Sequence, residues 1–239
     1  MPTTEGGGEM KLDLTHAIDG FSGNEHSLPV GAIYDDVVQL FARTGITYTP
    51  TLQVAFGGPF ALYSFVASEN AYLDAKLRRF TPQSVLYDRL TQRMMWFREE
   101  EYTFPVIAAG ASKIAQAGGR IGVGSHGELQ GMGLHWEMWA LAGKGANGMR
   151  NHDVLRAATL SGAEAIGLGQ ELGSLVVGKL ADLIVLDRDP LVNIRHTNTI
   201  RYVMKNGELY EGDTLKPIWP QTLAAPVFWW QRDLPVNTR

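Results

Sequence analysis

Two histidines follow short runs of strand-forming residues, and their side chains could carry out chemistry. His26 closes the run Gly23-Asn24-Glu25-His26, and His126 stands in the run Gly124-Ser125-His126-Gly127. An imidazole can bind a metal through one ring nitrogen, and it can exchange a proton near neutral pH. In hydrolytic barrels such side chains gather where the parallel strands end. We therefore expect both histidines at one mouth of a parallel sheet; the alternative is that each is a capping or core histidine satisfied by hydrogen bonds.

His135 and Glu137 lie near the start of a predicted helix, a few residues after His126. Their i, i+2 spacing puts them on different helix faces, so they are not expected to share a ligand. One of them is a candidate to contact the substrate or to support the metal ligands from behind. The other histidines, for which we expect surface or capping roles, are His16, His152 and His196.

The elements that must position these residues alternate between strand and helix. A short helix or turn at Leu12–Ile18 precedes the strand that ends near Glu25-His26. Helical spacing then runs from Tyr34 to Ala42 with a stop at Gly45, and a Thr, Tyr and Val-rich strand is predicted over Ile46–Ala55. The later predicted elements are a helix at Phe104–Gln116, a strand at Arg120–Gly124, and helices at Leu134–Ala142 and His152–Ile166, the last capped at Asn151. This order predicts an α/β fold with a parallel sheet.

After Gly173 the pattern changes to strands. Leu183–Asp187 and a hairpin at Tyr202–Tyr210, turning at Asn206-Gly207, are predicted there. We therefore divide the chain into a partial barrel over 1–172, with an insertion at about 57–103, β-sandwich strands over 173–215, and an irregular tail over 216–239. Five of the six tryptophans, Trp136, Trp139, Trp219, Trp229 and Trp230, are expected in the core and interfaces.

Composition limits the classes of function. The 239 residues are 45% hydrophobic and 19% charged, with a net charge of −4, so nucleic acid is not an expected partner. A small-molecule substrate fits better. No cysteine is present, which excludes disulfides and thiolate chemistry. We predict no membrane-spanning segment and find no signal peptide in this sequence. The localisation stays open: cytoplasmic if Met1 is the natural start, with a periplasmic or secreted protein as an open alternative if it is not.

The run from Gly173 to Pro190, with Gly178-Lys179 and Ala181-Asp182 at its centre, and the hairpin after it resemble the C-terminal signature of the amidohydrolase superfamily. Those proteins are metal-dependent hydrolases built on a TIM barrel with a small β-sandwich. The run around His126, the run His135-Trp136-Glu137 and the run Tyr48-Thr49-Pro50-Thr51 resemble an imidazolonepropionase-like subgroup, some of whose members are fused to TolB-type propellers. The resemblance implies the C-terminal portion of such a barrel.

The resemblance also implies roles for the candidate residues. His26 matches the histidine after the sixth strand, which is a metal ligand. His126 stands where most of the superfamily has an aspartate that binds metal and accepts the proton of the attacking water, so it is the candidate metal ligand and catalytic residue. Tyr48, His135 and Glu137 are candidates to bind substrate or to support the ligands. The implied cofactor is a divalent metal, zinc first, with iron, manganese or nickel as alternatives.

The sequence lacks the H-x-H that supplies two further ligands in this superfamily. We therefore expect an incomplete C-terminal fragment of an enzyme that hydrolyses carbon–nitrogen bonds in an amide, cyclic amide or dipeptide-like substrate, and the metal can be absent from this chain. The alternative is a non-catalytic binding or assembly module whose open sheet edge pairs with another chain or a second copy. A serine hydrolase is disfavoured because no G-x-S-x-G occurs.

Overall fold

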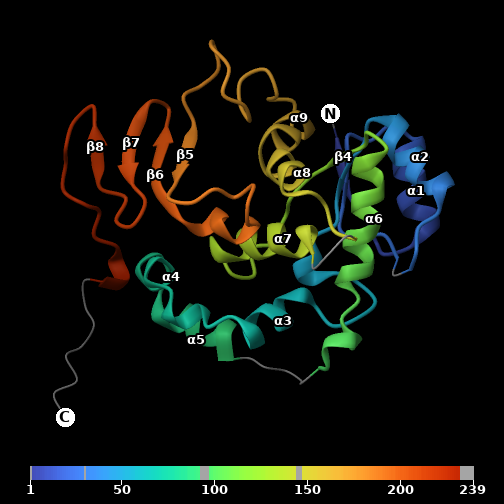
Figure 1. Cartoon of the computed structure of the whole chain (residues 1–239), viewed down its shortest axis with the longest axis horizontal. Coiled ribbons are helices and arrows are strands. Elements are labelled where there is room, and N and C mark those ends of the chain that lie inside the picture. Colours follow the sequence, from blue (N-terminus) through green and yellow to red (C-terminus); the bar gives the residue numbers. More distant parts are fainter. Residues whose placement is uncertain (1, 30, 92–96, 144–146, 232–239) are drawn as a thin grey trace.

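Two separate β-sheets organise the chain, whose residues 2–29, 31–91, 97–143 and 147–231 are described by a computed structural model (Figure 1). The first sheet is parallel, and its strands lie in chain order: β1 (Thr3–Glu5), β2 (Gly23–Glu25), β3 (Thr47–Thr49) and β4 (Arg120–Ile121). The second sheet is antiparallel, again in chain order: β5 (Leu183–Leu186), β6 (Ile200–Lys205), β7 (Glu208–Glu211) and β8 (Pro217–Trp219). The fold is thus α/β, a partial (β/α) barrel with an attached sheet, as the sequence predicts.

Three helices that connect the parallel strands pack beside one another along the first sheet (Figure 1). They are α1 (Met10–Ile18), α2 (Asp35–Thr44) and α6 (Phe104–Gln116). In α2, two aspartates occupy the first turn, where the helix dipole favours negative charge. The helix buries Val37, Val38 and Phe41, and it ends at Gly45 with φ 74°, a left-handed conformation that glycine adopts without strain.

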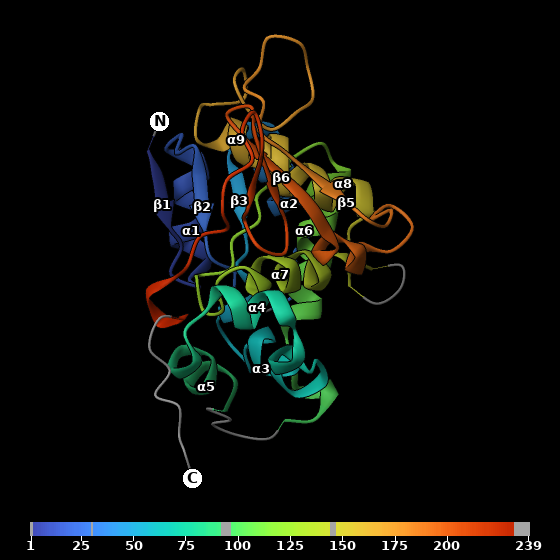
Figure 2. The same ribbon diagram turned by 90° about the vertical axis from the view of Figure 1, so that its left-hand side faces the viewer.

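The predicted insertion is built from short helices. Its helices are α3 (Ala61–Ser68), α4 (Ala75–Phe80) and α5 (Gln83–Thr91), with 3-10 turns at Ala71–Leu73 and Glu99–Glu101. Residues 92–96 of the predicted insertion lie outside the described residues. Figure 2 shows α3, α4 and α5 together on the side of the molecule toward which the parallel strands run, so the insertion adjoins the end of the sheet where both candidate histidines are expected.

Between β4 and the second sheet the regular structure is helical. Helix α7 (Met132–Ala142) lies between the parallel sheet and the insertion in both views (Figures 1 and 2). It is followed by α8 (Asn151–Arg156), a π-helical turn at Ala157–Ser161, and α9 (Gly162–Ala165). The hairpin between β6 and β7 turns at Asn206 and Gly207, both with positive φ, as a type I′ turn requires.

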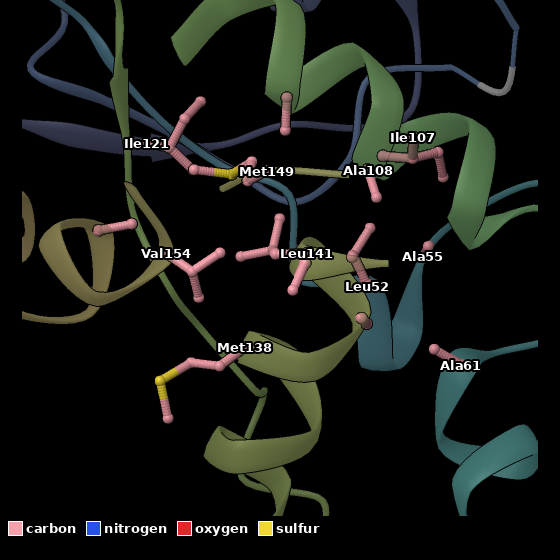
Figure 3. Packing of buried hydrophobic residues seen from close by; sticks show 14 of the residues in the cluster. Leu52, Ala55, Ala61, Ile107, Ala108, Ile121, Met138, Leu141, Met149 and Val154 are labelled. Carbon is pink, nitrogen blue, oxygen red and sulfur yellow. The ribbon is translucent and has the colours of Figure 1, made fainter. Parts of the chain in front are cut away.

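The hydrophobic core lies between the parallel sheet, α6, α7 and the turn after β3. Figure 3 shows Leu52 and Leu141 facing one another there, with Ile121 of β4 and Val154 of α8 close by. These side chains are almost completely buried. In contrast, Ile184 of β5 is 52% exposed, so the face of the second sheet to which it belongs is not part of this core.

Strands β3 and β4 are shorter than predicted. β3 ends at Thr49, and the predicted strand over Ile46–Ala55 is wrong beyond that point: Thr51 is left-handed and Leu52–Val54 form a 3-10 turn. The cause lies far away in the sequence, because the backbone N–H groups of Leu52 and Gln53 donate to the Glu137 carboxylate. Likewise, only Arg120–Ile121 of the predicted strand Arg120–Gly124 pairs with β3.

Four further sequence predictions are corrected. β1 was not predicted, because its three residues are followed at once by glycines. Asn151 does not cap α8 but is its first residue, and its side chain donates to the Leu191 carbonyl. Pro217–Trp219 form β8 within the predicted irregular tail. Trp219 and Trp229 are 54% and 73% exposed, whereas Trp136 and Trp139 are buried as expected.

None of the described helices is long and apolar enough to cross a membrane.

Candidate functional site

His26 and His126 lie together at the carboxyl end of the parallel sheet. His26 directly follows β2, and His126 comes five residues after β4. Their ring centroids are 5.3 Å apart and the ring planes are nearly perpendicular, at 67°. The structure therefore brings together the two histidines whose proximity the sequence predicts.

Both histidines have a left-handed backbone conformation, with φ 70° for His26 and φ 58° for His126. Such values are uncommon for residues other than glycine and are found preferentially where the surrounding structure imposes them, including at functional sites. The turn of the backbone at these two positions sets the direction in which each side chain leaves the chain.

The His26 imidazole is largely buried and contacts the Glu5 carboxylate. Its Nε2 lies 3.3 Å from Oε1 of Glu5, and its ring packs against Phe56 at 5.4 Å between centroids. Its Nδ1 is buried and has no hydrogen-bond partner among the described residues. Burial lowers the pKa of His26, the Glu5 carboxylate opposes that change, and His126 adds to it. The unpartnered Nδ1 is the kind of nitrogen that a ligand could take up.

Glu5 is a site residue that the sequence analysis missed. It is the last residue of β1, in register with Glu25 of β2, so its side chain leaves the sheet at the same end as His26. The sequence carries little signal for this strand, because its three residues give too little alternation to be recognised and glycines follow at once.

The His126 imidazole is more exposed and contacts a different carboxylate. Its Nδ1 lies 3.2 Å from Oε1 of Glu128. The other carboxylate oxygen of Glu128 accepts a hydrogen bond from Arg89, which belongs to α5 of the insertion. The insertion therefore contacts the site through a charged pair.

Tyr48 lies beneath the site. Its hydroxyl oxygen accepts a hydrogen bond of 3.0 Å from the backbone N–H of Leu28, two residues after His26. The side chain is 1% exposed, and burial raises the pKa of its hydroxyl well above the usual range. In this position Tyr48 holds the segment after His26 and is not open to a substrate within the described structure.

Glu137 is completely buried in α7. Its two oxygens accept hydrogen bonds from the backbone N–H groups of Leu52, at 2.7 Å, and Gln53, at 3.0 Å. Burial raises the pKa of Glu137 to about 8, and the hydrogen bonds from Leu52 and Gln53 oppose that rise. The carboxylate thus fixes the turn that follows β3.

His135 belongs to a separate cavity. Its Nδ1 is 3.1 Å from Oγ1 of Thr197, which also accepts from the indole N–H of Trp139. The cavity has a volume of about 290 Å³, and Asp74 and Lys76 of the insertion also line it. Burial lowers the pKa of His135 to about 4. Neither His26 nor His126 lines this cavity, so the structure does not group His135 with them.

The remaining histidines lie apart from the site. His16 is buried, contrary to the expected surface or capping role, and its Nδ1 pairs with Oδ1 of Asn24 at 2.8 Å. His152 is beside Asp153 at the surface. His196 is half-buried, and its Nδ1 lies 2.8 Å from the Asp189 carbonyl oxygen.

The donor set fits part of a metal centre. Two imidazoles and the Glu5 carboxylate are donors of the kinds that zinc takes. Among the residues that the structure describes, however, no three histidine, aspartate or glutamate side chains are arranged to hold an ion. His26 and His126 therefore supply two candidate ligands, and the described residues do not complete a centre.

The amidohydrolase family model matches residues 7–210 of the chain. The imidazolonepropionase of Thermoplasma volcanium is 34% identical over 64 residues, which are 26% of this chain and 16% of that protein. The 5-methylthioadenosine/S-adenosylhomocysteine deaminase of Syntrophobacter fumaroxidans is 40% identical over 72 residues, which are 25% of this chain and 16% of that protein.

Solved structures with the same fold cover nearly the whole chain. A Xaa-Pro dipeptidase with bound methionine superposes with a TM-score of 0.58 at 23% identity, over 88% of this chain and 44% of its own. Molinate hydrolase gives a TM-score of 0.59 at 19% identity, over 94% of this chain and 46% of its own. The chain therefore spans less than half the length of these structures.

Proposed function

Because the chain belongs to the amidohydrolase family, we propose that it contributes His26 and His126 to the active site of a metal-dependent hydrolase that cleaves carbon–nitrogen bonds. The observation that carries the proposal is the approach of the two imidazoles, 5.3 Å between centroids, at the carboxyl end of a parallel sheet. In barrels of this architecture that end is the active-site face. An amide, a cyclic amide or a dipeptide-like compound is the proposed substrate class.

A divalent metal such as zinc, when bound, supplies a Lewis acid that polarises the carbonyl of the scissile bond. His26 and His126 would each hold it through one ring nitrogen. The surroundings of His26 support this role, because its buried Nδ1 has no other partner among the described residues. Further ligands would have to come from groups other than the described ones.

His126 and Glu5 are the groups we propose for proton transfer; because a neutral imidazole has a single ring lone pair, His126 serves either as a metal ligand or as the proton acceptor. Each lies next to His26, and each can accept the proton that a water loses when it attacks the carbonyl. His126 takes the position of the usual aspartate in the sequence resemblance, whereas Glu5 adds a carboxylate from the neighbouring strand. A carboxylate from β1 offers the negative charge that a neutral imidazole lacks.

Tyr48 and Glu137 are proposed to support the site from behind. Tyr48 holds the backbone after His26 through Leu28, and Glu137 holds the turn after β3 through Leu52 and Gln53. Tyr48 and Glu137 thus each order a loop at the end of a parallel strand. His135 is proposed to act on a ligand in its own cavity.

Hydrolysis by the natural protein that contains this chain tests the proposal. The protein, purified in the presence of zinc, should hydrolyse a member of a panel of N-acyl amino acids, cyclic amides and dipeptides. His26→Ala and His126→Ala should each lower kcat/KM at least about 100-fold, as expected for loss of a ligand or a proton acceptor. His152→Ala, an exposed histidine away from the site, is the matched control. No turnover on any class, or full activity in both site variants, contradicts the proposal.

A second candidate function is a non-catalytic assembly module. Among the described strands of the parallel sheet, β1 and β4 each have a partner on one side only. Unpaired strand edges favour association with another chain. If this is the function, the chain should form a defined dimer or complex by analytical ultracentrifugation. The double variant His26→Ala/His126→Ala should form the same assembly, and no hydrolytic activity should depend on either histidine.

A further inference from the structure

We propose that Glu128 is a positioning residue for His126 and that Arg89, from the insertion, holds Glu128 in place. Glu128 would fix the imidazole in the tautomer that carries its proton on Nδ1, which leaves the lone pair of Nε2 free for a metal or a proton. This inference depends on the proposed function only in the role that Nε2 of His126 then plays, as a metal ligand or a proton acceptor. The tautomer itself is a property of this chain.

The carboxylate of Glu128 lies between two partners and uses one oxygen for each. Oε1 is 3.2 Å from Nδ1 of His126, and Oε2 accepts from Nη1 of Arg89. An ionised carboxylate accepts hydrogen bonds and cannot donate one, so its contact with the ring requires a proton on Nδ1. A neutral imidazole carries only one ring proton, and Nε2 is therefore unprotonated.

The backbone around His126 fixes where the side chain leaves the chain, but it does not fix the rotation of the imidazole ring. His126 and Gly127 have φ values of 58° and 71°, so two successive left-handed residues form the turn. The side chain of His126 is 47% exposed, and packing alone does not fix its rotation. Glu128, whose side chain is only 21% exposed, is the polar contact that can select one orientation.

Arg89 gives the carboxylate a second, fixed anchor. It lies in α5, 39 residues before Glu128 in the chain. Ion pairs that solvent reaches contribute little to stability. Stability is therefore a weak reason for this contact, whereas orientation of the carboxylate accounts for it directly. The insertion then acts on the site by holding Glu128.

His26 shows a related arrangement with the opposite nitrogen. Glu5 is next to its Nε2, and its Nδ1 is left without a partner among the described residues. Each of the two adjacent imidazoles thus has a carboxylate at one nitrogen only. Carboxylates in such positions orient imidazole ligands and increase their basicity.

The tautomer can be measured by long-range ¹H–¹⁵N correlation NMR on the chain labelled with ¹⁵N at histidine, at about pH 8.5, where histidine side chains are ordinarily neutral. The His126→Asn variant identifies the signal. In the unmodified chain the Nδ1–H form should dominate. In Glu128→Ala its ratio to the Nε2–H form should fall about fivefold or more, as expected when a charge-assisted hydrogen bond is lost.

Variants of Arg89 test the anchor separately. Arg89→Gln should lower the ratio of the Nδ1–H to the Nε2–H form, as Glu128→Ala does, but by a smaller factor. Arg89→Lys should keep the ratio close to that of the unmodified chain, because a lysine can still pair with the carboxylate. Arg195→Gln is the matched control, since it breaks another ion pair to the insertion, with Glu69, that does not reach His126. It should leave the ratio unchanged.

The two proposals fail in different ways. If the His126 tautomer ratio is the same in the unmodified chain and in Glu128→Ala, the positioning role of Glu128 is wrong, whatever the catalytic result. If Arg89→Gln matches the unmodified chain while Glu128→Ala shifts the ratio, the role of the insertion is wrong. Because the measurement needs neither metal nor substrate, absence of hydrolysis contradicts only the proposed function.

Discussion

Glu137 shows how a single buried carboxyl group can organise a loop. It is enclosed in α7, and its two oxygens accept hydrogen bonds from backbone N–H groups of a turn 84 and 85 residues earlier in the chain. Burial disfavours the ionised form and the hydrogen bonds favour it. The raised pKa indicates that burial is the larger effect. Stability of the fold should therefore depend on the protonation of this residue.

Glu137→Gln should change how stability depends on pH. The folded-state pKa of about 8 is above the ordinary value of 4.5, so the folded protein binds more protons than the unfolded chain between these values. The stabilisation that Glu137 contributes is fully present below pH 4.5, where its carboxyl group is neutral in both the folded and the unfolded chain. It is lost as pH rises toward 8, by at most about 1.4 kcal/mol per pH unit. The glutamine variant lacks this dependence.

The measurement is the free energy of unfolding in urea for the two proteins at several pH values from 5 to about 9. The variant should be less stable at pH 5, because its amide offers only one acceptor to two N–H donors, at a cost of about 1–3 kcal/mol. This deficit should shrink or reverse toward pH 9. Because other titrating groups are common to both proteins, parallel pH profiles would contradict a raised pKa for Glu137.

Tyr48→Phe should destabilise the chain by about 1–3 kcal/mol, because the buried backbone N–H of Leu28 would lose its acceptor. Tyr34→Phe is the matched control: Tyr34 is 76% exposed, and loss of its hydroxyl should change the free energy of unfolding by less than about 0.5 kcal/mol. Urea unfolding measures both. Equal effects in the two variants would show that the Tyr48 hydroxyl does not hold this segment.

At the scale of the elements, local signals predicted helices better than strands. The two aspartates at the start of α2 and Gly45 at its end are read directly from the sequence. β3 was predicted too long because its end depends on Glu137, which no local pattern around Thr49 reveals. The approach of His26 to His126 was predictable from strand order. Glu5 was not, because β1 is too short, and the roles of all these residues in catalysis remain predictions.

Close packing where α6 leads into β4 gives a prediction at the same scale. A Cβ at Gly119 would lie 3.0 Å from the backbone of Ala42 in α2 and 2.5 Å from the side chain of Ile114 in α6. Gly119→Ala should therefore destabilise the chain, by about 1–3 kcal/mol, as overpacking usually does.

Gly162→Ala provides the contrast. Gly162 is helical with φ −62°, and the nearest atom to an added Cβ is 3.5 Å away. Alanine is favoured over glycine inside a helix by about 0.5–1 kcal/mol, so this variant should be as stable as the unmodified chain or more so. Thermal unfolding followed by circular dichroism compares the two. If Gly119→Ala were also neutral, α2 and α6 would not pack as closely as the structure has them.

At the scale of the whole molecule, the two sheets differ in how well they are covered. The parallel sheet contributes to the main core, whereas β5 leaves Ile184 and Val185 substantially exposed, and Leu175 and Val177 in the preceding segment are 83% and 103% exposed. The limits that we assigned to the partial barrel and the sandwich strands, at 172 and 215, remain predictions. Homo-oligomerisation remains one as well, and the exposed apolar side chains near β5 are where a partner would gain most from burial.

The amount of metal that the chain retains depends on how many ligands it brings to one point. A catalytic zinc site generally takes three protein ligands and leaves one position open. The described residues bring His26 and His126 together but do not arrange three suitable side chains around one point. The 239-residue chain should therefore retain well below one zinc per molecule after extensive dialysis, measured by inductively coupled plasma mass spectrometry.

Joining the chain to a segment that supplies an H-x-H should raise the zinc content to about one or two per molecule. In the joined protein His26→Ala should lower the metal content, and His152→Ala should not. Stoichiometric zinc in the 239-residue chain, lost in His26→Ala, would instead show that this chain completes the centre by itself.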